Sequence, residues 1–323
     1  MTETEPTAGD AHLLPRWRGQ RGRLEVWYTT LTDPATGTGV WIHHELVAPS
    51  DGGPPRAHGW AAVFPTDQEP SFGRFGPVPW QEPQSGVAFA AGQVEVTAAR
   101  LSGVTDGPAA LAWDLNQHGG GEPLFTFPRW AWERELLPAA QIVPAPAARF
   151  TGTVRWRAGA LSVHDAPGAS ARIYGHGNAR RWAWLHADLG AGDVCEIVAA
   201  VSTRPVLRAL PPLPFVRLRL GGVDWPTRDP LLAALRLRAR IGLPTWTVTG
   251  RSGDRRIRVE VTQPPEATLA VDYTNPDGSP TVCRNTERAT AEITLDRRVR
   301  GSWTTEGHWR LDGTAHAEVG GDG

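Results

Sequence analysis

The abundance of glycine and proline is the feature of this sequence that most limits its fold. The chain has 323 residues, of which 36 are glycine and 29 are proline. Both residue types interrupt helices and mark turns. Such frequent interruption leaves room for many short strands and for few long helices. We therefore predict an all-β fold.

Runs of β-branched and aromatic residues alternate with these turn signals. Residues 24–31 stop before Asp33-Pro34, and residues 39–48 stop before the glycine-rich turn at 50–54, which together predict a hairpin. Their spacing favours a meander that closes into a barrel or a sandwich. Further strands are predicted at 60–64, 87–98, 111–115, 152–157, 172–174, 182–189, 194–201, 245–249, 256–262, 268–273 and 289–295.

The length of the chain favours two domains. Seven prolines crowd residues 204–244, so we predict a linker there, between an N-terminal barrel at 16–203 and a C-terminal barrel or half-barrel at 245–311. Within the linker, residues 230–241 form the best helical stretch, with Asp229 as the N-cap and Gly242 as the stop. Residues 1–15 and 312–323 are predicted to be flexible tails.

Charge and composition exclude several classes of protein. The net charge is −1 and all 33 basic residues are arginine, which gives no broad attraction to nucleic acid. The first residues contain no apolar signal region, and no run approaches 18 apolar residues, so we predict a cytoplasmic protein without a membrane span. Cys195 and Cys283 lie far apart and outside any CxxC spacing, which excludes a disulfide framework and a zinc ribbon.

The predicted strand 182–189 gathers aromatic and ionisable side chains on one face. Successive side chains of a strand point to opposite sides, so Trp182, Trp184, His186 and Asp188 share a face. Indole rings on that face would stack a flat or unsaturated ligand, while His186 and Asp188 would transfer protons. The alternative is that this face is the wet outside of a barrel.

The predicted strand 39–48 repeats this mixture. Trp41, His43 and Glu45 share one face, and we take Trp41 as a pocket wall and the other two as proton-transfer or orienting groups. His44 points to the other side of the strand. Adjacent histidines on opposite faces cannot bind one ion, so we predict no metal site.

Two blocks of sequence resemble a known family. Residues 24–28 (LEVWY) with 39–45 (GVWIHHE), and residues 174–178 (YGHGN) with 182–186 (WAWLH), resemble the two signatures of the lipocalin-like family that includes AttH-like proteins, hydroxyneurosporene synthase (a carotenoid hydratase) and tocopherol cyclase. In that family pattern an acidic residue precedes the signature histidine. Gly175 stands at this position here, so no general acid for protonating an alkene is found beside that histidine.

The resemblance implies a tandem pair of lipocalin-like barrels that bind a polyene or prenyl compound and protonate, hydrate or cyclise it without an organic cofactor. It also assigns residues. His176 would be the signature histidine, and the ligand would contact Glu25, Trp27, Tyr174, Asn178, Trp182 and Trp184.

Together these features predict a cofactor-independent cyclase, isomerase or hydratase. Its substrate, and its only predicted partner, would be a hydrophobic isoprenoid or polyketide polyene held in an aromatic pocket of the N-terminal barrel. One alternative is a carrier that binds such a molecule without chemistry, and another is a structural protein with a filled core. A strongly perturbed acid or base in a water-excluding site would distinguish the enzyme from the carrier.

Overall fold

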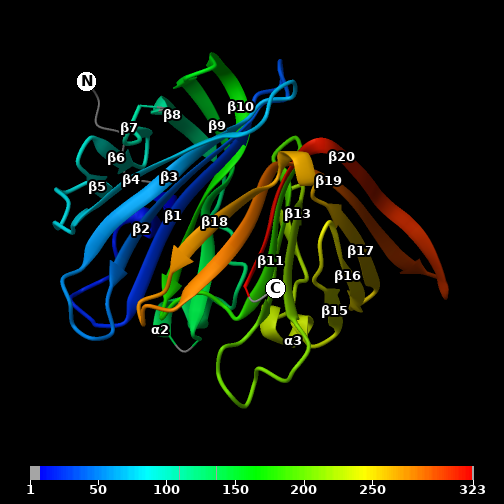
Figure 1. The fold of residues 1–323 in the computed structure, drawn as a ribbon. Helices are drawn as coiled ribbons and strands as arrows, with labels where there is room; N and C mark the ends of the chain where they lie inside the picture. The colour runs from blue at the N-terminus through cyan, green and yellow to red at the C-terminus, as the bar shows by residue number, and fades with distance from the viewer. Residues whose placement is uncertain (1–7, 109, 136, 322–323) are drawn as a thin grey trace.

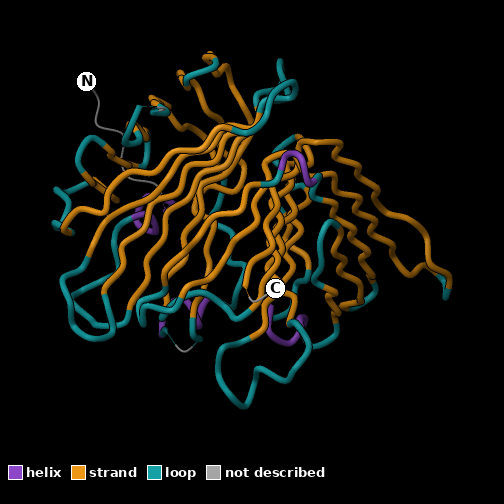
Figure 2. Tube along the Cα trace, viewed as in Figure 1, coloured by secondary structure: helices purple, strands orange, loops and turns teal. Residues whose placement is uncertain are grey.

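Antiparallel strands form almost all of the secondary structure, which confirms the predicted all-β fold (Figures 1 and 2). The computed structural model describes residues 8–108, 110–135 and 137–321. Within these ranges, no helix is both long enough and apolar enough to cross a lipid bilayer.

The first sheet has ten strands in the order β4-β3-β2-β1-β10-β9-β8-β7-β6-β5. Its β1–β2 hairpin pairs Thr32 with Gly39 at the turn, as the sequence predicted. The strands are β1 Arg23–Thr32, β2 Gly39–Ala48, β3 Arg56–Phe64, β4 Ser71–Pro79, β5 Val87–Ala91, β6 Val94–Thr97, β7 Arg100–Val104, β8 Ala112–Gly120, β9 Ala139–Trp156 and β10 Gly159–Gly175, with helices α1 Ala8–Leu13 and α2 Arg129–Arg134 beside them.

The second sheet runs β14-β13-β12-β11-β20-β19-β17-β16-β15, and β18 also pairs with β19. The long hairpin of β19 and β20 is its largest element and extends to the right in Figure 1. The strands are β11 Arg181–Gly190, β12 Asp193–Val201, β13 Leu213–Leu220, β14 Val223–Trp225, β15 Leu237–Arg240, β16 Thr245–Ser252, β17 Arg255–Thr262, β18 Leu269–Thr274, β19 Pro280–Val299 and β20 Ser302–Gly321, with α3 Pro230–Ala234 and a short 3-10 turn at Pro265–Ala267.

Each sheet curls around its own apolar core. One core takes side chains from every strand of the first sheet, including Trp27, Ile42 and Phe89. The other takes side chains from β11 to β17, β19 and β20, including Leu185 and Trp246. These clusters occupy the two interiors, and a smaller cluster around Trp132 and Tyr174 lies beside α2.

A third buried layer lies between the two sheets and joins them. It contains two clusters with members from both sheets, one around Tyr28 and Trp184 and one around Trp41 and Trp182. The approach is close, because a Cβ atom on Gly39 would lie 2.4 Å from the Cβ of Glu287 on β19. Only glycine allows β2 and β19 to cross at this distance.

The predicted domain boundaries differ from the boundaries of the sheets. The first sheet ends at Gly175, and β11 and β12, which the sequence placed in the N-terminal barrel, pair within the second sheet. The proline-rich segment 204–244 is not a separate linker, because it contributes β13, β14 and β15 to that same sheet, with α3 between β14 and β15. The local abundance of proline predicted a linker, but strand pairing over long sequence distances decides which sheet a strand joins.

The helix predicted at 230–241 is correct only in its first part. α3 begins as expected, with the Asp229 side chain accepting a hydrogen bond from Leu231 N at 2.9 Å, but it ends at Ala234. Residues 237–240 instead form β15, with Leu237 buried and Arg238 exposed in alternation. This alternation of buried and exposed side chains, with a period of two residues, fits a strand at the sheet edge better than a helix.

The predicted tails also differ from the structure. The C-terminal segment to Gly321 belongs to β20, and Ala315 and Ala317 on it are fully buried. Its glycines mark close packing, since a Cβ on Gly320 would lie 2.1 Å from the Trp182 ring. At the other end, α1 places Leu13 in the first core. Residues 1–7 and 322–323 lie outside the described residues.

Candidate functional site

Aromatic rings fill one part of the layer between the sheets. His43 of β2 stacks on Trp60 of β3, with ring centroids 4.1 Å apart and planes inclined by 7°. Trp41 lies edge-on to Trp60 at 5.6 Å, and Tyr273 of β18 lies 4.9 Å from the same ring. Trp182 of β11 completes the group, 6.3 Å from Tyr273. Side chains from both sheets therefore form one aromatic wall.

A buried carboxylate lies beside this wall on the first sheet. Glu45 Oε1 is 3.0 Å from His43 Nε2, and Glu45 Oε2 is 3.3 Å from His58 Nε2. Burial alone would raise the pKa of Glu45. The hydrogen bond from His43 and the electrostatic interactions with His43, His58 and Arg74 outweigh burial, so the pKa of Glu45 is lowered. Glu45 is ionised at neutral pH.

A second carboxyl group reaches the wall from the second sheet. Glu318 of β20 accepts hydrogen bonds from Trp182 Nε1 at 2.7 Å and from the Cys283 thiol at 3.3 Å. Burial raises the pKa of Glu318 above its usual range, although these hydrogen bonds and the charge of His43 act against the shift.

A third carboxyl group lies further along the same layer. Glu287 of β19 accepts a hydrogen bond from the Thr30 hydroxyl of β1, and its Oε2 lies 2.5 Å from Nδ1 of His316. Burial raises the pKa of Glu287 well above its usual range and lowers the pKa of His316 well below its own. Both shifts favour the neutral form of each side chain.

Glu196 of β12 organises the remaining polar groups. It accepts hydrogen bonds from Trp184 Nε1 at 2.6 Å and Gln141 Nε2 at 2.7 Å, and it lies 2.9 Å from His186 Nδ1. Gln141 also donates to the Tyr28 hydroxyl. The other ring nitrogen of His186 is buried and has no hydrogen-bond partner among the described residues. A buried group of this kind is a candidate contact for a ligand or an ordered water.

The layer holds carboxyl groups whose pKa values are shifted in opposite directions. The pKa of Glu45 is lowered, whereas the pKa values of Glu287 and Glu318 are raised. Shifts in opposite directions would allow one carboxyl group to accept a proton and another to donate one. The faces of the indole rings add electron-rich surfaces that stabilise positive charge nearby.

Six of the twelve residues expected from the sequence lie in this layer. The face of β2 that bears Trp41 meets the face of β11 that bears Trp182. The layer lies outside both sheet interiors, however, and the predicted pocket inside the N-terminal barrel is occupied by the first core. The six residues are Trp41, His43, Glu45, Trp182, Trp184 and His186.

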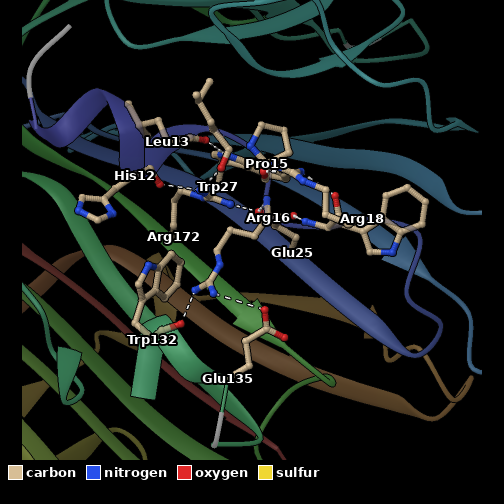
Figure 3. Close-up of polar contacts among 12 residues, drawn as sticks. His12, Leu13, Pro15, Arg16, Arg18, Glu25, Trp27, Trp132, Glu135 and Arg172 are labelled. Atoms are coloured by element: carbon tan, nitrogen blue, oxygen red, sulfur yellow. Dashed lines mark hydrogen bonds and ion pairs between the residues drawn. The ribbon is translucent and has the colours of Figure 1, made fainter. Parts of the chain in front are cut away.

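Glu25 and Trp27 lie on the opposite side of the first sheet, because Trp27 pairs with His44 and not with His43. Glu25 forms a fully buried ion pair with Arg172, whose guanidinium covers the Trp27 ring at 4.7 Å. Arg172 also donates to backbone carbonyls of the N-terminal segment, and Glu25 accepts from the backbone nitrogen of Arg16 (Figure 3). These residues fix the N-terminal segment to the barrel.

Tyr174 and His176 lie at that end of the first sheet, beside a pocket of about 10 Å³ lined also by Arg16 and Trp132. The volume has room for roughly one water molecule. Burial lowers the pKa of His176, and Nδ1 of this histidine contacts Arg23 at 2.8 Å. Neither residue reaches the layer between the sheets.

Asp188 and Asn178 have local structural roles. The Asp188 carboxylate accepts a hydrogen bond from Gly190 N at 2.7 Å in the turn after β11. The amide group and backbone nitrogen of Asn178 donate to the Asn275 side chain, which ties the connection between the sheets to the β18–β19 turn.

Sequence reasoning missed the acidic residues of the second sheet. The signal was present, because Glu196 is the one acid among the apolar residues 194–201, and His316 and Glu318 alternate with Ala315 and Ala317. The glycines near the C-terminus concealed the second pattern by indicating a tail. The acidic group that Gly175 lacks is matched here by the buried carboxyl groups of Glu287 on β19 and Glu318 on β20.

The two tandem antiparallel sheets, with a buried aromatic and carboxyl layer between them, define a lipocalin-like fold. Residues 94–321 match the family model described as tocopherol cyclase-like, and the chain belongs to this family. It is also 48% identical over 324 residues to the protein Rv0493c of Mycobacterium tuberculosis strain H37Rv, an alignment that covers 98% of this chain and 94% of that protein.

Solved structures share the fold at low sequence identity. A putative AttH protein of Nitrosomonas europaea superposes with a TM-score of 0.58 at 13% identity, covering 92% of each chain. CghA, crystallised with Sch210972, gives a TM-score of 0.59 at 15% identity and covers 93% of this chain and 88% of its own. Kievitone hydratase of Nectria haematococca gives 0.50 at 11% identity, covering 92% of this chain and 88% of its own.

Proposed function

We propose that this protein is a cofactor-independent cyclase, isomerase or hydratase that protonates an alkene of a hydrophobic isoprenoid or polyketide polyene. The layer between the sheets is the proposed site, and the substrate lies against the aromatic wall. Membership of the tocopherol cyclase-like family supports this class of reaction. The fold shared with a hydratase and with CghA is consistent with it.

In the proposed reaction, Glu318 or Glu287 gives its proton to one carbon of a double bond, which leaves a carbocation on the other carbon. The indole faces of Trp41, Trp60 and Trp182 stabilise that cation. An internal hydroxyl then closes a ring and loses its proton, water adds and loses a proton, or a neighbouring C–H loses its proton. Ring closure by an internal alkene instead leaves a new cation, which then loses a C–H proton. Each route releases one proton, so the acid can be restored. Glu45, ionised and held by His43 and His58, is the proposed acceptor.

The observation that carries the proposal is a pair of buried carboxyl groups with raised pKa values in the layer between the sheets, one of which, Glu318, is hydrogen-bonded to Trp182 of the aromatic wall. Burial in an apolar layer favours the protonated form of a carboxyl group. Such groups supply the general acid that protonation of an alkene requires.

Deuterium incorporation tests the acid step. The protein is incubated in D₂O with a prenylated hydroquinone and, separately, with an apolar extract of the source cells, and mass spectrometry follows products that gain one deuterium on carbon. Binding is measured in parallel by the fluorescence of cis-parinaric acid, a polyene probe. We expect Glu318→Gln or Glu287→Gln to abolish incorporation while the affinity for the probe changes less than threefold.

Glu306→Gln is the matched control, because Glu306 forms an exposed ion pair with Arg255 away from the layer. It should leave both readouts unchanged. Saturable probe binding without deuterium incorporation by the unaltered protein would assign the carrier function instead. Loss of probe binding together with turnover in both glutamine variants would indicate that these acids serve packing.

A further inference from the structure

Exposed apolar side chains are concentrated at one end of the second sheet. The loop at 202–212, between β12 and β13, carries Val206, Leu207 and Leu210, which are 86%, 39% and 57% exposed. On and beside α3, Leu232 and Leu235 are 59% and 68% exposed. The loop and α3 lie at the same end of this sheet, at the bottom of Figures 1 and 2. We call these five side chains the apolar end.

The loop does not need these side chains for its own fold. Backbone bonds from Leu207 N and Arg208 N to the Arg204 carbonyl, at 2.9 and 3.0 Å, form a single turn. Pro205 and the pair at 211–212 restrict the backbone on either side. The turn therefore exposes its apolar side chains to water. Single exposed apolar residues are common on protein surfaces, whereas a cluster of them indicates an interaction site.

The segments around the apolar end carry arginines and no acidic residues. Residues 201–223 and 230–253 contain no aspartate or glutamate. Arg204, Arg208 and Arg236 are exposed on these segments. Because the whole chain has a net charge of −1, this excess is local. A patch that combines apolar side chains with arginines is complementary to a surface that is apolar within and negatively charged at its face.

We propose that the apolar end docks on an anionic lipid surface. Val206, Leu207 and Leu210 enter the boundary between headgroups and acyl chains, and Arg204 and Arg208 bind the lipid phosphates. A second copy of the chain is the less favourable occupant, because a twofold contact would bring the same arginines of both copies together. The proposal holds whether the layer between the sheets catalyses a reaction or only binds a ligand.

Vesicle flotation with the full chain tests this surface. Vesicles of phosphatidylcholine alone are compared with vesicles containing 30% phosphatidylglycerol at low salt, about 0.05 M NaCl. We expect binding to the anionic vesicles to be at least tenfold stronger and to weaken as NaCl is raised to about 0.5 M. The triple variant Val206→Ser, Leu207→Ser, Leu210→Ser should bind these vesicles at least tenfold more weakly.

Two further variants separate the apolar and charged contributions. Arg204→Gln with Arg208→Gln should remove most of the preference for anionic vesicles, a change of roughly tenfold or more. Val223→Ser and Val299→Ser are matched controls, since both valines are exposed but lie on β14 and at the tip of β19; they should bind like the unaltered chain. Equal binding to both vesicle types, or full binding by the serine triple variant, would overturn the proposal.

Sedimentation velocity without lipid tests whether a second copy of the chain covers the apolar end instead. A monomer in the unaltered chain and in the triple variant is expected. A dimer that the triple variant abolishes would assign the apolar end to self-association and overturn lipid docking. Because neither readout uses turnover, failure here leaves the test of the proposed function unaffected, and the reverse also holds.

Discussion

The indole nitrogen of Trp182 donates a 2.7 Å hydrogen bond to Glu318, and so joins β11 to the neighbouring strand β20 inside the layer between the sheets. The bond opposes the effect of burial on the acid, since it lowers the pKa that burial raises. Trp182 of the aromatic wall thus counteracts part of the effect of burial on the carboxyl group beside it, and this coupling can be measured.

Trp182→Phe should raise the pKa of Glu318 further. Phenylalanine keeps an aromatic ring in the wall but removes the hydrogen bond that favours the charged carboxylate. The infrared C=O band of protonated carboxyl groups, followed against pH, would then persist to higher pH than in the unaltered chain. The same titration with Trp182→Phe and Glu318→Gln combined identifies the band; an unchanged titration midpoint would contradict the prediction.

Glu287→Gln should make stability less dependent on pH. The pKa of Glu287 is raised in the folded state, so the folded protein binds the proton more tightly. The resulting stabilisation is fully present below the unfolded pKa of about 4.3 and is lost as the pH rises toward the folded pKa. Urea unfolding at pH 5, 7 and 9 should show a smaller decline in the free energy of unfolding for the variant.

Glu306→Gln serves as the control for that series. The hydrogen bond from Arg255 lowers the pKa of Glu306, so this residue does not titrate between pH 5 and 9. The decline in its variant should match that of the unaltered chain. A Glu287→Gln decline as steep as the control would show that Glu287 is ionised in the folded protein.

His44→Leu should protect the first sheet against acid. Burial in the first core, beside Phe75 and Phe89, lowers the pKa of His44 to about 3. A histidine with a lowered folded pKa contributes stability that is present above the unfolded pKa of about 6.5 and is lost as the pH falls below it. At pH 4 this loss is about 3 kcal/mol.

The comparison uses the change in unfolding free energy between pH 7 and pH 4, because leucine also removes the hydrogen bond to the Trp27 carbonyl at both pH values. The variant should lose about 3 kcal/mol less than the unaltered chain over that range. Identical losses would mean that His44 is protonated inside the core.

Breaking the Glu25–Arg172 pair should destabilise the protein by about 3–5 kcal/mol, because one charge is left buried without its partner. Arg172→Met should also increase hydrogen exchange at residues 12–17, where Arg172 and Glu25 bind the backbone. The double variant Glu25→Gln, Arg172→Met should recover much of the loss. Asp114→Asn, in an exposed pair with Arg100, should cost about 1 kcal/mol or less.

The fold class and the strand faces were accessible from the sequence because each depends on local patterns. Frequent turns predicted short strands, and a period of two separated His43 from His44 and Trp182 from Ala183 correctly. The strand at 237–240 was not predicted, because the proline and the apolar run that precede these residues indicated a longer helix.

The sequence alone determined which side chains lie on the same face of a strand. It did not determine where that face points, since both faces of β2 and β11 are buried and apolar content no longer distinguishes inside from outside. Pairing between residues more than a hundred positions apart placed β11 beside β20 and brought Glu318 to Trp182, whereas the register of the β1–β2 hairpin set Glu25 on the far side from Glu45. Where these groups lie is decided by tertiary structure, because long-range strand pairing and the packing of one sheet on the other bring them together.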